Sequence, residues 1–221
     1  MTIDSRFNQM LGFSEEDVRQ MIRYYKEVGA IKPEVTEDSI IDDIKPWYDN
    51  YCFAKDSFGT EPSMFNSDMV CYYMSTLVDT GRKPEELIDP NTMTDYGKLK
   101  RLIRIDKTEG KRTEIIHDIV EKGFIKARLV SHFPAERMME FGNFVSLLYY
   151  YGMLTIGGTI GERLKLIIPN NNVRLQYYQY LLDEYSAIHF IDISGLDDYF
   201  DQAALDGDWQ PLLSFICKAY H

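Results

Sequence analysis

Residues that hold metals or form disulfides are scarce in this 221-residue sequence. Its three cysteines, Cys52, Cys71 and Cys217, lie far apart, and no two of them form a C-x-x-C pair. Disulfide frameworks use an even number of cysteines, and zinc sites use closely paired ligands. The four histidines form neither an H-E-x-x-H nor an H-x-x-x-H pair. We therefore expect free thiols in a reducing compartment and no metal site.

The sequence also lacks a long apolar segment and an excess of positive charge. Residues 141–161 are the longest uncharged stretch, but five glycines and a run of tyrosines interrupt it. We expect a buried helix and a strand there rather than a membrane span. The first residues carry charges where a signal peptide would be apolar. The net charge of −11 excludes a polycation that binds nucleic acid over its whole surface. Together these absences predict a cytoplasmic protein without a membrane partner.

Motifs for nucleotide binding and nucleophilic catalysis are missing as well. There is no G-x-x-x-x-G-K-[ST] phosphate loop and no G-x-S-x-G nucleophile elbow. Two triplets, Asp43–Lys45 and Glu109–Lys111, match the (D/E)-x-K of metal-dependent nucleases, whose acids hold Mg²⁺. Such triplets arise often by chance in a chain that is 27% charged. A nuclease is therefore an alternative function, and we assign no catalytic, cofactor-binding or metal-binding residue.

Apolar residues recur at helical spacing, so we expect a mainly α-helical fold with a small β-hairpin. Ser14 and the acids after it favour a helix start, and Gly29 ends that helix. Asn66 or Ser67 begins another helix, which ends near Gly81. The other predicted helices are Asp38–Lys45, which Pro46 stops, Tyr96–Ile105, Thr113–Lys122, Ala135–Tyr151 and Asn172–Tyr185.

A β-hairpin is predicted between residues 153 and 168. Met153–Ile156 and Leu164–Ile168 are apolar, and the glycine-rich segment between them is expected to form the loop. A helix followed by a hairpin is how a winged-helix unit ends. We therefore divide the chain into a helical lid-like segment over 1–90, a helical and winged-helix-like segment over 91–185, and acidic C-terminal helices over 186–221.

Charge is distributed unevenly along the chain. Lys98–Arg128 contains ten basic and five acidic residues, whereas the last forty residues contain eight acids and one lysine. The basic stretch is explained by helices with solvated outer faces or by a surface that faces phosphate or nucleic acid. A stand-alone module that binds nucleic acid or protein is accordingly a second alternative function.

Six segments resemble, in the same order, motifs of the bacterial AAA-ATPase-like family. The resemblance covers nearly the whole chain. The segments are Leu11–Val18 (LGFSEEDV), Ile44–Phe53 (IKPWYDNYCF), Phe65–Ser67 (FNS), Tyr150–Ile156 (YYGMLTI), Ile168–Arg174 (IPNNNVR) and Ala204–Asp208 (ALDGD).

The resemblance implies a function that depends on parts outside this sequence. Members of that family have a P-loop ATPase core before these motifs and often a PD-(D/E)XK nuclease-like domain after them. The chain resembles the middle segment, which implies a non-catalytic lid and winged-helix-like piece that couples the ATPase core to an effector. ATP and Mg²⁺ would be bound by the parent protein, and the two missing domains would be the partners of this chain.

The motifs contain the residues that we expect to be structural or to contact another domain. Trp47, Tyr48 and Tyr51 are candidates for core anchors. Asp49 could instead face the missing ATPase core and sense its nucleotide, and Arg174 could pair with a local acid or reach a missing domain. The full set of candidates is Trp47, Tyr48, Asp49, Tyr51, Asn66, Pro169, Asn170 and Arg174.

Three positions depart from the family pattern. Asn50 stands where glycine is usual, Ser67 replaces proline, and Asn172 replaces the common glutamate. Asparagine is one of the few other residues that tolerate positive φ, so we expect the turn at Asn50 to persist.

Overall fold

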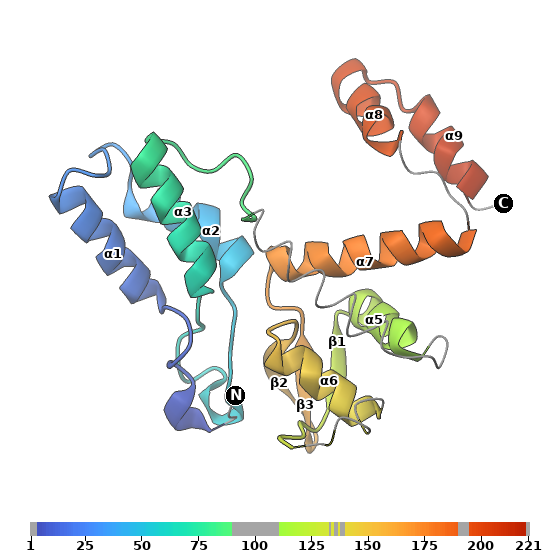
Figure 1. Ribbon diagram of the computed structural model, residues 1–221, viewed down its shortest axis with the longest axis horizontal. Coiled ribbons are helices and arrows are strands. Elements are labelled where there is room, and N and C mark those ends of the chain that lie inside the picture. Colours follow the sequence, from blue (N-terminus) through green and yellow to red (C-terminus); the bar gives the residue numbers. More distant parts are fainter. Residues whose placement is uncertain are drawn as a thin grey trace. The chain divides into compact units, whose positions relative to one another are not determined.

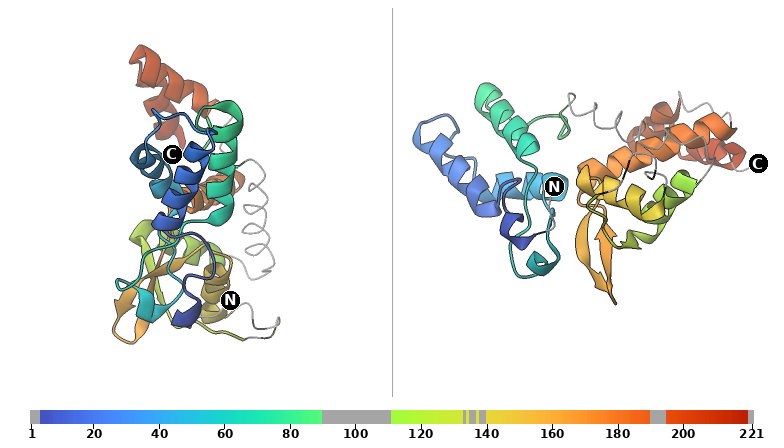
Figure 2. Two further views of the ribbon diagram at one scale, coloured as in Figure 1. Left: turned by 90° about the vertical axis from the view of Figure 1, so that its left-hand side faces the viewer. Right: turned by 60° about the horizontal axis from the view of Figure 1, so that its bottom comes forward.

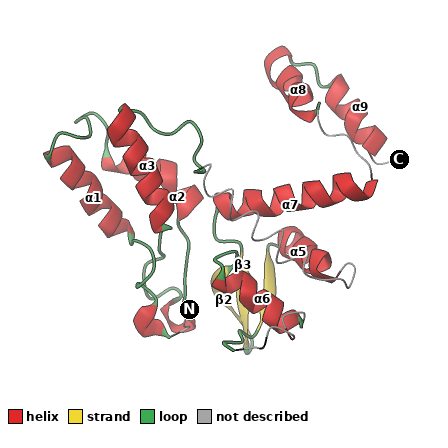
Figure 3. Cartoon of the chain, in the orientation of Figure 1, coloured by secondary structure: helices red, strands yellow, loops and turns green. Residues whose placement is uncertain are grey.

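The computed structural model describes residues 4–89, 111–132, 134, 137, 140–189 and 195–219. These residues form mainly α-helices and one small three-stranded antiparallel sheet, which confirms the predicted fold class (Figures 1 and 3). The chain divides into a unit over residues 1–178 and a unit over residues 179–221. Within the described ranges, no helix combines the length and the apolar character needed to cross a membrane.

Three helices form the helical part of the first unit: α1 (Glu15–Glu27), α2 (Glu37–Tyr48) and α3 (Ser67–Thr80). The predicted start of α1 is confirmed, because Ser14 and Asp17 form a reciprocal capping box. Asn66 caps α3 by accepting two backbone N–H groups, and Gly81 ends α3 in the left-handed conformation. The caps therefore begin and end these helices where the sequence predicts.

The three helices bury one continuous apolar core. Each helix places its apolar side chains on one face, as helical spacing requires. Burying one large apolar side chain contributes about 1.5–3 kcal/mol, so this core is the main source of stability in the helical part. Its fully buried members include Val18, Ile22, Ile40, Ile44, Tyr48, Phe65, Met69, Val70 and Tyr73.

The prediction that Pro46 stops α2 is wrong, because the helix continues to Tyr48. Proline in a helix removes one backbone hydrogen bond and crowds the preceding turn. Pro46 lies on the exposed side of the last turn, where only two further helical residues follow it. The extra turn brings Trp47 and Tyr48 onto the core.

The sheet part of the first unit follows along the chain. It comprises α5 (Lys111–Lys122), β1 (Phe124–Ala127), α6 (Phe141–Tyr150), β2 (Thr155–Ile160), β3 (Arg163–Ile167) and the first turns of α7 (Asn171–His189). The strand order is β1-β3-β2, and both pairings are antiparallel. The predicted hairpin corresponds to β2 and β3.

One face of the sheet is buried. Ile125, Ile156 and Leu166 share this face and are almost completely buried. Helices α5 and α6 both contact β1 and lie beside the sheet in both figures (Figures 1 and 2). Their buried apolar residues include Ile116, Ile119, Phe144, Val145 and Leu148. The opposite face of the sheet therefore carries the polar residues of β1 and β3.

Two further details differ from the sequence prediction. Gly157 and Gly158 lie inside β2, at a register shift between Ile156 and Thr159, and not in the hairpin loop. A Cβ at Gly157 would lie 2.8 Å from the side chain of Ile167, so the strand needs a glycine here for close packing. Helix α6 begins at Phe141 and not at residue 135.

A strap, residues 51–58, runs along the edge of β2. The Cys52 N–H donates to Thr155 Oγ1 at 2.7 Å, and the Ile156 N–H donates to the Cys52 carbonyl at 3.3 Å. The Tyr149 hydroxyl of α6 donates to the Phe53 carbonyl at 2.7 Å. These bonds tie the strap, which follows α2 in sequence, to the sheet part.

The second unit contains the end of α7, α8 (Leu196–Asp201), a π-helical turn (Gln202–Asp206) and α9 (Gln210–Ala219). Helices α8 and α9 contact each other, with the rings of Tyr199 and Phe215 5.7 Å apart. The predicted helix Tyr96–Ile105, residues 98–110 of the basic stretch and the expected boundary at residues 90–91 lie outside the described residues.

Candidate functional site

Two of the motif segments meet through a reciprocal pair of hydrogen bonds. The Asn50 side-chain amide donates to the Pro169 carbonyl at 2.8 Å. The Asn170 side-chain amide donates to the Asp49 carbonyl at 2.9 Å. We call Asp49, Asn50, Pro169 and Asn170 the latch. It joins the end of α2 to the start of α7, although these segments are more than a hundred residues apart in the sequence.

Asn50 combines two roles in the latch. Its φ of 79° makes it the only residue other than glycine with positive φ among the described residues. Asparagine adopts this conformation more readily than most residues do. The expectation that Asn50 keeps the turn is therefore confirmed. Its side chain adds a hydrogen bond that a glycine at this position could not make.

Asn170 also serves two segments at once. It is 6% exposed, and its Oδ1 accepts the Val173 N–H at 3.2 Å, as an N-cap residue does. Its amide nitrogen meanwhile donates to Asp49. Asn66 makes a similar connection, because its backbone N–H donates to the Tyr48 carbonyl at 2.8 Å while its side chain caps α3. At position 170 asparagine suits this double role because its side-chain amide both donates and accepts.

The side chain of Asp49 has a buried oxygen for which no hydrogen-bond partner is seen among the described residues. It is 5% exposed, and its Oδ1 has no hydrogen-bond partner among the described residues. A buried carboxylate oxygen without a partner is costly and uncommon in folded proteins. The structure places Asp49 inside the latch, so within the described residues it is covered and not presented to solvent.

The aromatic motif residues are anchors. Trp47 packs against the core of the helical part, and Tyr48 is fully buried with its hydroxyl donating to the Leu87 carbonyl at 2.6 Å. Burial raises the pKa of Tyr48 well above its usual range. The ring of Tyr51 stacks on that of Phe53 at 5.8 Å. These positions agree with the anchor interpretation of the sequence.

Arg174 does not join the other motif residues. It lies in the first turn of α7 with its side chain exposed, and its backbone N–H donates to the Asn170 carbonyl at 3.0 Å. No ion pair of its guanidinium is seen within the ranges that the structure covers. The side chain is therefore available to a partner.

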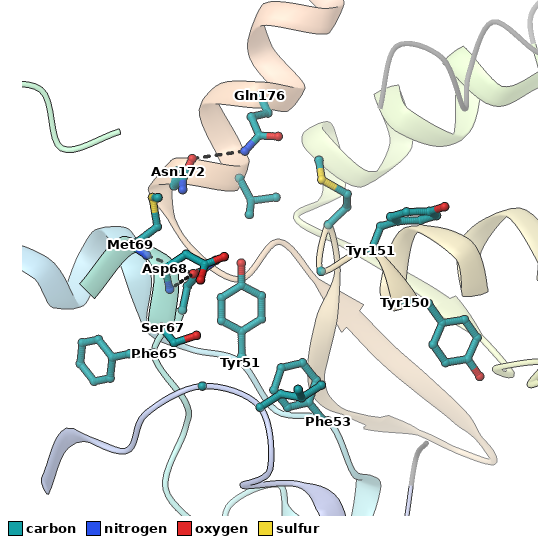
Figure 4. A pocket seen from close by; sticks show the side chains of 16 residues that line it. Tyr51, Phe53, Phe65, Ser67, Asp68, Met69, Tyr150, Tyr151, Asn172 and Gln176 are labelled. Atoms are coloured by element: carbon teal, nitrogen blue, oxygen red, sulfur yellow. Dashed lines mark hydrogen bonds between the residues drawn. The ribbon is translucent and has the colours of Figure 1, made fainter. Parts of the chain in front are cut away.

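A cleft of about 280 Å³ adjoins the latch. The N-terminal ends of α3 and α7, the strap and the turn after α6 surround it. Figure 4 shows the ring of Tyr51 standing in the cleft, with Asn172 and Gln176 of α7 on one side and Ser67 and Asp68 of α3 on another. The lining also includes Leu11, Gly12, Phe53, Phe65, Asn66, Met69, Tyr150, Tyr151, Gly152, Met153 and Val173.

The chemistry of the cleft is aromatic and acceptor-rich. None of the described residues that line it is Lys, Arg or His, whereas phosphate groups are held mainly by such cations. The Gln176 Nε2 donates to Asn172 Oδ1 at 3.2 Å, which leaves the buried Oε1 of Gln176 without a partner among the described residues. The cleft therefore suits an apolar group that carries a hydrogen-bond donor. Sequence reasoning missed Gln176, although its i,i+4 spacing from Asn172 was a usable signal.

The two charged residues of the nuclease-like triplet Asp43–Lys45 form contacts within the helical part. The Asp43 carboxylate accepts from the Tyr73 hydroxyl at 3.0 Å and from Lys83 Nζ at 3.1 Å. Lys45 pairs with Glu15 at 2.8 Å. In the described part of the chain, no three His, Cys, Asp or Glu residues are grouped to hold a metal ion. The second triplet begins outside the described residues.

The three cysteines are free thiols, as the sequence predicts. Cys52 is buried in the strap, and burial raises the pKa of its thiol. A protonated thiol is a poor nucleophile, so Cys52 is suited to packing rather than to catalysis.

The chain was compared with protein families, curated proteins and solved structures. No protein-family model matches the chain, and neither a curated protein nor a solved structure matches it at a significant level. The resemblance to the AAA-ATPase-like family therefore stays a prediction from the motifs.

Proposed function

We propose that this chain is a non-catalytic lid and coupling segment of an ATPase-like protein. The observation that carries the proposal is the latch, because it is built from two motif segments on which the resemblance depends. Asp49 and Asn50 belong to the aromatic motif, and Pro169 and Asn170 belong to the motif before α7. In this proposal the two motifs act together by holding α2 against the start of α7, and neither motif supplies a catalytic group.

The proposed mechanism is the transmission of movement from the helical part to α7. Asp49 and Asn170 are buried, so water competes little for the bond between them, whereas Asn50 is exposed and its bond to Pro169 is only partly shielded. The strap adds a second connection through Cys52 and Thr155. A force applied to α1–α3 by an ATPase core would then displace the start of α7 together with α2, and α7 would carry the displacement onward.

The lining of the cleft favours a protein partner rather than a nucleotide as its ligand. Its lining offers aromatic surface and hydrogen-bond acceptors without a cation, which suits an apolar polypeptide segment. ATP and Mg²⁺ would bind in the ATPase core, and the cleft would receive a segment of that core.

The mechanical role is tested with Asn50→Gly. Glycine keeps the positive φ of the turn and removes only the bond to Pro169, which has a net value of about 0.5–1.5 kcal/mol. Hydrogen exchange followed by mass spectrometry should show amide exchange about threefold to tenfold faster at residues 167–175. As a control, Asn66→Ser keeps the cap of α3 and should leave exchange at those residues unchanged. Unchanged exchange in Asn50→Gly would contradict a coupling role for the latch.

The ATPase link is tested separately. Calorimetric titration of the chain with Mg²⁺·ATP should show no micromolar binding, since the proposal places the nucleotide elsewhere. The intact mass and flanking sequence of the polypeptide in its source cell should reveal a G-x-x-x-x-G-K-[ST] loop outside this segment. Tight nucleotide binding by the chain itself, or a native polypeptide without such a loop, would overturn the proposal.

A further inference from the structure

The outer face of the sheet combines cations with an aromatic ring. Side chains alternate along a strand, so Phe124 and Lys126 of β1 share one face. Lys165 is the direct partner of Lys126 across the strands, and Arg163 lies two residues before Lys165 on the same face. Lys126 and Arg163 are exposed, while Phe124 and Lys165 are partly exposed. We call these four residues the basic face.

The two lysines surround the phenylalanine ring. The ammonium nitrogen of Lys165 lies 5.1 Å from the centre of the Phe124 ring, and that of Lys126 lies 5.9 Å from it. Such contacts are weak at exposed sites, about 0.5–1 kcal/mol. Like charges directly opposite each other on a sheet destabilise it. The pair Lys126 and Lys165 is therefore an unfavourable choice for the fold alone, and an anion on this face would relieve the repulsion.

No carboxylate within the described residues compensates the basic face. Lys126, Arg163 and Lys165 form no ion pair there, although Arg128 and Glu162 pair with each other at its rim. The chain as a whole carries a net charge of −11, so acidic residues are plentiful. A cluster of cations without an ion-paired acid is thus a local exception.

We propose that the basic face binds single-stranded nucleic acid. This inference is independent of the proposed coupling function, because it concerns a different surface. The cations would contact phosphates, and Phe124 would stack against one base after the ammonium groups move to the phosphates. Residues two apart on a strand are about 6.6 Å apart, which is comparable with the separation of neighbouring phosphates in an extended strand. An acidic polypeptide would use the charges but not the ring, so the aromatic residue favours nucleic acid.

Fluorescence anisotropy with a labelled oligothymidylate of about 20 nucleotides tests the proposal. Binding should weaken steeply between about 50 and 200 mM salt. The double variant Lys126→Gln with Lys165→Gln should reduce affinity at least about tenfold and lower the slope of log K against log salt by about 1.4, that is, about 0.7 for each phosphate contact. Phe124→Leu should reduce affinity at least about fivefold and leave the slope unchanged, because stacking releases no counterion.

A matched control removes the same charge from another surface. Lys32 and Arg82 are exposed in the helical part, and the double variant Lys32→Gln with Arg82→Gln should bind as the unchanged chain does. Circular dichroism should confirm that every variant is folded. Absence of binding at low salt would overturn the proposal. Equal losses in the two double variants, or equally tight binding of an oligoglutamate of the same charge, would also overturn it, because both would indicate general charge attraction.

Discussion

The helical part and the sheet part use their positive charges differently. In α1 and α2 every arginine and lysine has an acceptor: Arg19 contacts Asp38 at 2.8 Å, Arg23 contacts Glu37 at 3.1 Å, and Lys45 contacts Glu15 at 2.8 Å. Lys26 donates to two backbone carbonyls. The strands of the sheet part carry Lys126, Arg163 and Lys165, for which no acidic partner is seen in the described ranges.

This contrast separates charges that support the fold from charges that are available to a partner. Surface ion pairs contribute little individually, but these pairs connect α1 to both ends of α2. Cations on a sheet face without acidic neighbours add repulsion instead. The cations of α1 and α2 are therefore paired within the fold, whereas those of the basic face are available to an anion.

The largest expected loss in the free energy of unfolding comes from a core variant. This variant also tests whether the helical part and the sheet part unfold together. Ile44 is fully buried in the core of the helical part, and Ile44→Ala should lower the free energy of unfolding by about 2–5 kcal/mol. If the latch joins the parts, urea unfolding should show one shifted transition in both far-ultraviolet circular dichroism and tryptophan fluorescence. The corresponding variant of the sheet part, Leu166→Ala, should produce a shift of similar size.

Two separate transitions in either variant would break this expectation. They would indicate that the helical part and the sheet part are independent, and the latch would then be a surface contact without a mechanical role. Ile44→Val, which removes one methyl group, should shift the same transition by only about 0.5–1.5 kcal/mol.

A smaller effect is expected at the segment that precedes α1. Gly12 has a φ of +102°, and a Cβ there would lie 2.5 Å from the Phe65 carbonyl oxygen. Gly12→Ala should therefore break the bridge between Phe13 and Phe65 and lower the free energy of unfolding by about 2–3 kcal/mol. Gly29→Ala is the control, because Gly29 also has positive φ but open space around it. It should cost only about 1 kcal/mol in the same urea titration. Equal losses would show that conformation, and not crowding at Phe65, sets the requirement for glycine.

Local signals in the sequence predicted the helical part well. Ser14, Asn66 and Gly81 act at the ends of their helices as their residue types suggest. The hairpin was recognisable because its apolar runs flank glycines. These features depend on neighbours in the sequence, so a single sequence reveals them.

Features that depend on distant contacts were harder to predict. Pro46 is tolerated only because its ring lies on the exposed side of the last turn of α2. Gly157 is needed in the strand because a Cβ there would meet Ile167, and Gly158 has a φ of +125°; no local pattern reveals either requirement. The latch residues could be named from the motifs, but that Asn50 meets Pro169 follows only from the fold. The spacing of Gln176 from Asn172 could be read from the sequence, but that both residues line a cleft follows only from the fold.

The smallest expected effect on stability concerns Glu15, the partner of two paired cations in α1 and α2. Lys45 and Arg19 donate hydrogen bonds to Glu15 and lower the pKa of its carboxyl below the usual 4.5. A carboxyl whose pKa is lower in the folded state stabilises the fold above the unfolded pKa, and this contribution is lost as the pH falls through the folded pKa. Glu15→Gln should therefore lower the free energy of unfolding by about 0.2–1 kcal/mol at pH 7, and urea titrations should show this loss shrinking as the pH falls below 4.5.

Matched variants test whether the ion pairs of Glu15 cause this pH dependence of the free energy of unfolding. Glu34→Gln removes the same charge from an exposed position between α1 and α2, and it should leave the stability at pH 7 unchanged. Lys126→Gln in the sheet part should leave the stability unchanged or raise it by a few tenths of a kcal/mol, because it removes repulsion from Lys165. A loss of stability in Lys126→Gln comparable with that in Glu15→Gln would mean that the strand lysines support the fold. The basic face would then no longer differ from the helical part, and its cations would give no reason to expect an anionic partner.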